Sequence, residues 1–128
     1  MKISLTSIFV NSPVEAHKFY TQVLGFQSRM FIPEMNLAIV ASPEEPAGTG
    51  LMLEPNDNPI ASSYQKGLYE QKLPAIVFGV DDIHAETARL KKQGVIFTKE
   101  PTRTDWGFEA VFEDTCGNFI QLAEMAKS

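Results

Sequence analysis

The chain carries one structural plan twice, and this repeat limits its fold more than any other feature of the sequence. The segment Val10-Asn11-Ser12-Pro13-Val14-Glu15-Ala16 follows a strand-like run and begins a helix that reaches Gly25. The segment Val80-Asp81-Asp82-Ile83-His84-Ala85 also follows a strand-like run, and its helix reaches Gly94. Two halves that share a strand, a cap, a helix and a glycine predict two modules of the same fold.

The first helix has a defined start and a defined inner face. Ser12 and Glu15 form a capping box, a pair that can satisfy free backbone N–H groups of the first turn. Pro13 suits the first helical position, because proline lacks the N–H that would be unpaired there. Apolar residues then recur at the spacing of one helix face: Ala16, Phe19, Tyr20, Val23 and Leu24.

The second helix is the more polar of the two. Asp81 or Asp82 can cap its N-terminus, and Gly94 stands where a left-handed residue often ends a helix. The pattern predicts an inner face made of Ile83, Thr87 and Leu90.

Short strand-like segments precede and follow each helix, with turn residues between them. In the first half they are residues 3–10, 28–32, 37–41 and 51–54, and in the second half 75–80, 96–98, 108–113 and 118–123. Each half therefore reads βαβββ. We divide a single domain, residues 1–128, into module 1 (about 1–56), a connector (about 57–73) with a short helix around 63–71, and module 2 (about 74–125).

Composition excludes several classes of protein. The 128 residues are enough for one domain with its own core. No apolar run approaches the roughly 20 residues of a membrane span, and the N-terminus does not resemble a secretory signal, so we expect a cytoplasmic protein. A net charge of -5 without a basic cluster argues against binding nucleic acid. The single cysteine, Cys116, cannot form an intramolecular disulfide.

Two segments link the repeat to a known family. Phe19-Tyr20-Thr21-Gln22-Val23-Leu24-Gly25-Phe26 has an aromatic pair followed by Leu-Gly-Phe, and residues 114–122 form a turn and a strand similar to an Asp-Pro-Asp-Gly-Asn ending. Both resemble the vicinal oxygen chelate superfamily, which includes glyoxalase I, bleomycin and fosfomycin resistance proteins and extradiol dioxygenases. The resemblance covers nearly the whole chain. It implies an α+β fold in which two βαβββ modules form a U-shaped mixed sheet around a cleft.

The resemblance also implies where a metal ion would bind. Glyoxalase-like members hold it with four histidine or glutamate ligands on the inner strands. The corresponding positions in this sequence are Leu5, Met52, Ala75 and Gln121. Three of these side chains cannot bind a hard divalent ion, and neutral Gln121 is a poor replacement for a carboxylate. We therefore expect no metal and no cofactor there.

The histidines and the cysteine offer little support for another metal site. His17 and His84 fall within or at the start of helices in different modules, where we expect solvent-exposed side chains. Cys116 has no histidine or second cysteine near it in the sequence, so only its residue type supports a nucleophilic role.

Strand alternation extends the family positions to their neighbours, because residues two apart share a face. The predicted cleft is mostly apolar, which suits a small, partly aromatic ligand held by a few hydrogen bonds; an ordinary core would have the same composition. Its predicted polar contacts are Ser7, Glu54 and Gln121. Its other predicted residues are Leu5, Phe9, Met52, Ala75, Val77, Gly79, Phe119 and Ala123.

Further candidates lie outside this set. Arg103 and Trp106 precede an inner strand, and a guanidinium beside an indole suits a planar or anionic ligand; a tryptophan that anchors a surface loop is the alternative. The connector adds Tyr64 and Tyr69. Glu109 could act as a general base if it faces the cleft, but the alternation leaves its face open.

Two classes of function have support in the sequence, and a third, a scaffold or regulatory domain that binds another protein, has no specific sign in it. The missing ligands favour a metal-free protein that binds a small molecule, with eight ligand-binding residues: Ser7, Phe9, Met52, Glu54, Arg103, Trp106, Phe119 and Gln121. The family resemblance leaves open a lyase, isomerase or dioxygenase that uses a non-standard metal site, or Glu54 or Glu109 as acid or base. Because such modules generally close their clefts by pairing sheets, we predict a homodimer. The sequence leaves open whether the modules pair within one chain or between two, and whether the connector is a lid.

Overall fold

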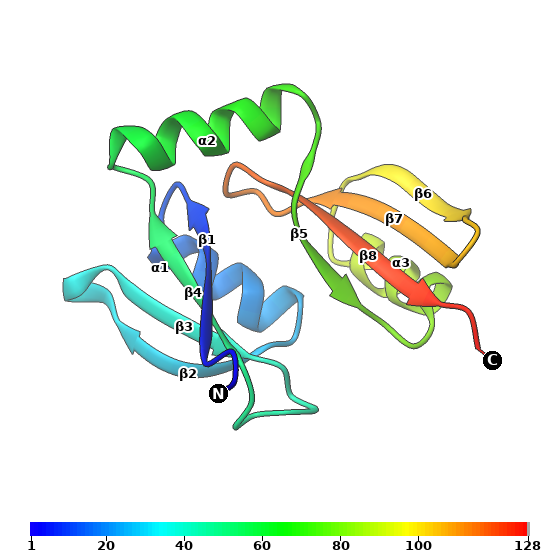
Figure 1. Ribbon diagram of the computed structural model, residues 1–128, viewed down its shortest axis with the longest axis horizontal. Coiled ribbons are helices and arrows are strands. Elements are labelled where there is room, and N and C mark those ends of the chain that lie inside the picture. Colours follow the sequence, from blue (N-terminus) through cyan, green and yellow to red (C-terminus); the bar gives the residue numbers. More distant parts are fainter. Residues whose placement is uncertain (128) are drawn as a thin grey trace.

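The computed structural model describes residues 1–127, which form two four-stranded mixed sheets with helices packed against them (Figure 1). The first half contains β1 (Leu5–Val10), α1 (Pro13–Lys18), β2 (Gln27–Ile32), β3 (Leu37–Ala41) and β4 (Gly50–Pro55), with short helical turns at Phe19–Val23 and Pro33–Met35. Helix α2 (Pro59–Glu70) joins it to β5 (Pro74–Gly79), α3 (Ile83–Lys92), β6 (Phe97–Arg103), β7 (Gly107–Glu113) and β8 (Phe119–Met125).

Both sheets have the same topology, which confirms the predicted α+β fold of two βαβββ modules. The strand orders are β1-β4-β3-β2 and β5-β8-β7-β6. The first strand of each module pairs in parallel with the last, and the other pairings are antiparallel. Within residues 1–127 no strand pairing joins the two sheets, so β1 and β5 are each an edge strand.

The first helix begins and ends as the sequence predicts. The Ser12 hydroxyl accepts a hydrogen bond from the backbone N–H of Glu15 at 3.3 Å. After Lys18 the helix widens into a π-helical turn, in which the Leu24 N–H bonds to the Phe19 carbonyl at 3.1 Å. Gly25 then ends it with φ of +91°, a conformation that glycine adopts at little cost.

The second helix is capped by Asp82, which decides between the two predicted candidates. Its carboxylate accepts from the Ala85 N–H at 3.1 Å, and Gly94 ends the helix with φ of +88°. The predicted inner face, Ile83, Thr87 and Leu90, is buried.

Two elements extend further than the sequence indicates. Helix α2 begins four residues before the predicted start, because Asn58 caps it and Pro59 occupies its first position. Strand β6 continues to Arg103 through a polar run that contains Pro101. An outer strand tolerates such residues, since one of its edges needs no partner.

The core lies between the inner faces of the sheets and the helices. Tyr20 and Phe112 are its largest completely buried side chains, with smaller residues from all three layers around them. Strand residues alternate, so Ile8, Val10, Leu51 and Leu53 point into this core. None of the helices in residues 1–127 is both long and apolar enough to cross a membrane.

Candidate functional site

Each sheet has a second face, opposite the one on which α1 or α3 packs, and we call it the open face of that sheet. In the first sheet it carries the alternate residues of β1 and β4: Ser7 is the neighbour of Met52, and Phe9 of Glu54. Leu5 is the first residue of β1 and is 44% exposed. Apolar side chains with one hydroxyl and one carboxylate therefore line this face.

The open face of the second sheet is built in the same way. Val77 is the neighbour of Gln121, and Gln121 is the neighbour of Val111. Glu109 lies on this face beside Ala123, which answers a question that alternation alone left open. Its carboxylate pairs with Lys99 at 3.1 Å, and both side chains are partly exposed.

Helix α2 places one tyrosine against each open face. Tyr64 contacts Phe9 edge to face, with ring centroids 6.4 Å apart. Tyr69 stacks on Phe119 at 4.7 Å, and its hydroxyl donates a hydrogen bond to Glu113, which raises the pKa of Tyr69. Phe119, predicted to contact ligand directly, is therefore only 5% exposed. The sequence shows these tyrosines but not which strand residues they cover.

The four family metal positions are divided between the two sheets. Leu5 and Met52 lie on the first open face, and Ala75 and Gln121 belong to strands of the second. Residues of both modules line a hollow of about 50 Å³, among them Ser7, Phe9 and Ala75, together with Tyr64 of α2. This hollow is far smaller than the roughly 300–1,000 Å³ of typical ligand sites.

Arg103 and Trp106 do not converge. The Arg103 guanidinium lies 5.1 Å from the ring centroid of Phe108, which packs against the core on the helix side of the sheet. Trp106 lies in the turn between β6 and β7 and is 37% exposed. Its carbonyl accepts from the Ala126 N–H at 2.7 Å, so the backbone of this turn is held by the C-terminal segment.

Both histidines contact aromatic rings in separate modules. His17 stacks on Phe31 at 3.8 Å and its Nε2 bonds with the Ser28 hydroxyl at 2.8 Å, so it is more enclosed than expected. Partial burial lowers the pKa of His17. His84 is exposed and contacts the edge of Phe108. Within residues 1–127, no three His, Cys, Asp or Glu side chains gather as a metal ion would require.

The turn between β7 and β8 lies at the junction of the two modules. Its Asn118 side chain donates to the Phe9 carbonyl at 2.8 Å, and Gln65 of α2 donates to the Cys116 carbonyl at 3.0 Å. Cys116 itself is 3% exposed, and burial raises the pKa of its thiol to about 12. A thiol in this environment stays protonated near neutral pH and is a poor nucleophile.

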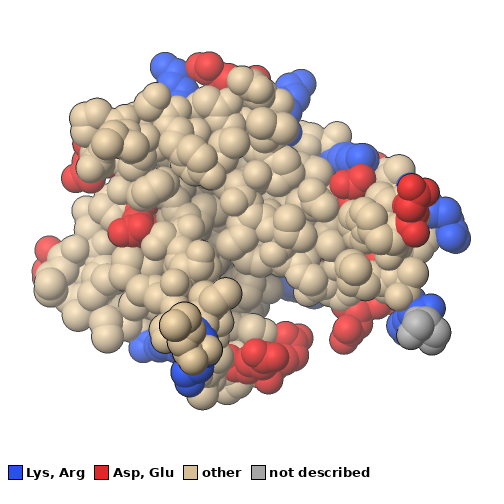
Figure 2. Space-filling view, viewed as in Figure 1, with Lys and Arg blue, Asp and Glu red and all other residues tan. Residues whose placement is uncertain are grey.

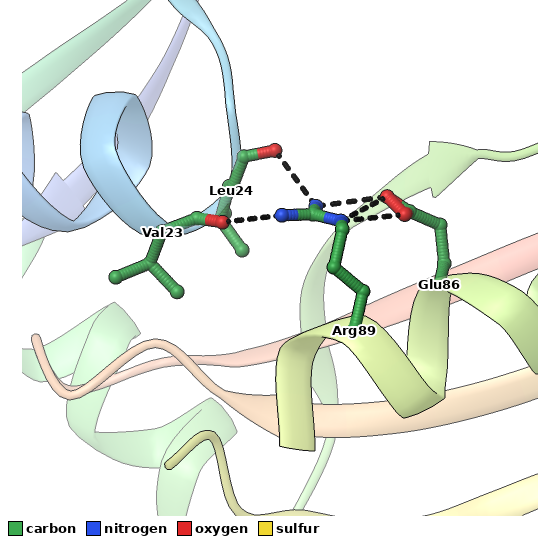
Figure 3. Close-up of polar contacts among 4 residues, drawn as sticks. All are labelled: Val23, Leu24, Glu86 and Arg89. Atoms are coloured by element: carbon green, nitrogen blue, oxygen red, sulfur yellow. Dashed lines mark hydrogen bonds and ion pairs between the residues drawn. The ribbon is translucent and has the colours of Figure 1, made fainter. Parts of the chain in front are cut away.

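A second contact between the modules lies near the C-terminal end of the first helix. Arg89 of α3 donates to the carbonyls of Val23 at 2.9 Å and Leu24 at 3.2 Å (Figure 3). Its Nε and Nη2 also bond the Glu86 carboxylate at 2.8–3.1 Å. One guanidinium therefore satisfies helix-end carbonyls and binds the modules together.

Comparison with known proteins agrees with this architecture. The sequence pattern of the glyoxalase/bleomycin resistance protein/dioxygenase superfamily matches residues 2–122. The uncharacterized protein YurT of Bacillus subtilis (strain 168) is 47% identical over 97% of this chain and 99% of its own length. The crystal structure of UcmS2 superposes with a TM-score of 0.79 at 29% identity and covers 95% of this chain and 96% of that one.

Another similar structure has a function in its description. TnmS3, described as an antibiotic binding protein from Streptomyces sp. CB03234, has a TM-score of 0.75 and 27% identity over 98% of this chain and 97% of its own. The repeated βαβββ topology and the match over nearly the whole sequence lead to one conclusion. This chain belongs to the glyoxalase/bleomycin resistance protein/dioxygenase superfamily.

Proposed function

We propose that this protein is a cytoplasmic, metal-free homodimer that binds a small organic molecule against the open faces of its sheets. The observation that carries the proposal is the composition of those faces. Around Met52 and Gln121 they present mostly apolar side chains with a few polar groups, of which Ser7 and Glu54 lie on the first sheet. Binding sites for small molecules commonly combine an apolar lining with a few polar contacts.

The proposed ligand is partly aromatic. Phe9 supplies an aromatic surface on the first sheet. On the second sheet the Tyr69 ring covers Phe119, so Tyr69 would contact the ligand and Phe119 would support it from behind. Trp106 in the turn between β6 and β7 is kept as an outer contact in this proposal, whereas Arg103, predicted as a ligand contact, lies over Phe108 on the helix side and is left out. The relative described as an antibiotic binding protein supports a ligand of this kind.

The dimer follows from the incomplete cleft in one chain. The open faces belong to two sheets that share no strand pairing within residues 1–127. Leu5 on edge strand β1 is 44% exposed, and Val77 on edge strand β5 is 53% exposed. A second copy would cover these apolar side chains. In such a dimer the open face of a first sheet and the open face of a second sheet would form the two walls of one cleft.

Binding is favoured over catalysis by the environment of the candidate catalytic groups. Glu54 and Glu109 belong to different sheets, and no hydrogen bond joins their side chains. Glu109 already pairs with Lys99. The Cys116 thiol is buried and stays protonated near neutral pH.

The test combines metal analysis with native mass spectrometry of the purified protein. We expect no stoichiometric divalent metal, together with an added mass from a co-purifying small molecule. Titration with a panel of aromatic antibiotics should give at least one saturable ligand. Its affinity should fall in Gln121→Ala and stay unchanged in Gln93→Ala, a matched change at the exposed end of α3. Stoichiometric metal that is lost in Gln121→Ala would replace this proposal with the enzyme alternative.

A further inference from the structure

A crevice of about 310 Å³ lies between the modules, and we call it the seam crevice. Module 1 contributes residues 24–26 and the loop residues 42–44 to its walls. Module 2 contributes the end of β5 and the side of α3, including Val77–Val80, Glu86, Arg89 and Leu90. Both modules of one chain build this crevice, so it does not need a second copy to exist.

The floor of the seam crevice is apolar and aromatic. Phe26 and Phe78 meet edge to face with centroids 4.9 Å apart, and Phe112 and Leu122 close the bottom. The volume is at the lower end of the range of about 300–1,000 Å³ for small-molecule pockets.

The polar groups around this floor favour a positive charge. Arg89 is the one basic residue in the lining, and its three nitrogens already donate to Glu86 and to two carbonyls (Figure 3). Glu44 adds a second carboxylate from the loop between β3 and β4. Figure 2 shows acidic side chains gathered at the lower edge of the molecule, where this loop lies. The chain as a whole has a net charge of -5.

We propose that the seam crevice is a separate binding site for a planar aromatic cation. The rings of Phe26 and Phe78 would contact the flat body of the ligand. The carboxylate of Glu44 would face its positive group, while Glu86 keeps Arg89 neutralised. An anion of the same shape would face Glu44 without a free cation to pair with it, so the site selects by charge as well as by shape.

The test uses proflavine, a tricyclic aromatic cation, titrated by its own fluorescence into the intact protein. Val80→Trp enlarges a half-buried side chain of the lining that lies on the same side of the chain as Phe78, and it should weaken binding by about tenfold or more, since a filled pocket cannot accept the dye without strain. Val14→Trp is the matched control, because Val14 is 37% exposed on α1 and lies outside the crevice lining. It should bind proflavine as the wild type does.

Charge and location are tested separately. Glu44→Gln should weaken proflavine binding by about threefold, the size expected for one partly screened charge. Glu45→Gln, next in sequence but outside the crevice lining, should have no effect. Anthracene-2-carboxylate, an anion of similar shape, should bind at least about tenfold more weakly than proflavine.

Three results would overturn the proposal. They are unchanged binding in Val80→Trp, equal binding of the anion, and loss of proflavine binding in Gln121→Lys, which would place the dye on the open face. The proposed function is tested by a different measurement, the affinity of the protein for an aromatic antibiotic in Gln121→Ala. Failure of one proposal is therefore distinguishable from failure of the other.

Discussion

Tyr20 of the first module donates a hydrogen bond to the carboxylate of Asp114 in the second, with 2.7 Å between the two oxygens. Both side chains are completely buried. Asp114 also accepts from the N–H groups of Cys116 and Asn118 and from the Asn118 side chain. This pair is thus the centre of a buried polar network at the junction of the modules.

Tyr20→Phe should destabilise the protein by about 1–3 kcal/mol, because a buried acceptor loses one partner while the aromatic packing remains. The free energy of unfolding from urea denaturation measures the loss. Tyr64→Phe is the control: Tyr64 is 57% exposed, so its change should be near zero. Equal values for the two variants would show that the bond between the modules contributes nothing.

Asp114→Asn should change how stability depends on pH. Burial raises the pKa of Asp114 above its ordinary value of 3.8, against the opposing effect of its hydrogen bonds. The folded state therefore holds this proton more tightly than the unfolded state. The resulting stabilisation is complete below pH 3.8 and is lost as the pH rises through the folded pKa.

The measurement is the difference in unfolding free energy between the wild type and Asp114→Asn. The unfolding free energy of the wild type should increase relative to that of Asp114→Asn as the pH falls from neutral toward 3.8. A movement in the opposite direction would mean that the four hydrogen bonds outweigh burial and lower the pKa of Asp114.

Gly117→Ala should be destabilising by about 1–3 kcal/mol, from backbone strain and crowding together. Gly117 has φ of +96°, and a Cβ there would lie 2.6 Å from the Gln65 amide nitrogen and 2.9 Å from the Asn11 amide oxygen. Gly67→Ala changes a glycine in the middle of α2 with free space around it. It should stabilise the protein by about 0.5–1 kcal/mol, so thermal melting should move in opposite directions for the two variants.

Trp106→Ala should weaken ligand binding by about 1–3 kcal/mol if the indole is an outer contact of the proposed site. Because Trp106 is 37% exposed, its truncation should cost less than the roughly 3–5 kcal/mol of a core aromatic. One titration and one melting curve on the same variant are sufficient. Unchanged affinity would remove Trp106 from the site.

The homodimer should dissociate more readily when its proposed apolar contacts become charged. Val77→Lys on edge strand β5 should convert a dimer at micromolar concentration into monomers, as measured by sedimentation velocity. Ile96→Lys is the control, because Ile96 is 65% exposed but precedes outer strand β6. A wild type that sediments as a monomer would contradict the prediction directly.

The fold could be predicted because its signals are local. Ser12, Pro13 and Gly25 mark the limits of the first helix within a few residues of sequence. The outer strand β6 was underestimated because its polar residues carry no alternation. Its pairing with β7, rather than its own composition, makes it a strand.

The candidate site could be predicted only in part, because its important contacts join distant residues. Alternation predicts which residues of β1 and β4 share a face. It does not predict that Tyr69 stacks on Phe119, 50 positions away along the chain. The seam crevice was missed for the same reason, since Phe26, Glu44 and Phe78 come together only after both modules pack.

The bond from Tyr20 to Asp114 also bears on how a duplicated chain of this kind can arise. A half-length ancestor equivalent to residues 1–56 would contain the tyrosine but not its buried acceptor. A second copy of the same segment would bring another tyrosine and no acceptor, so this bond requires two halves that have diverged in sequence. On this view the bond arose after gene fusion, and the two modern halves can no longer be separated without losing a hydrogen bond that only the fused chain can form.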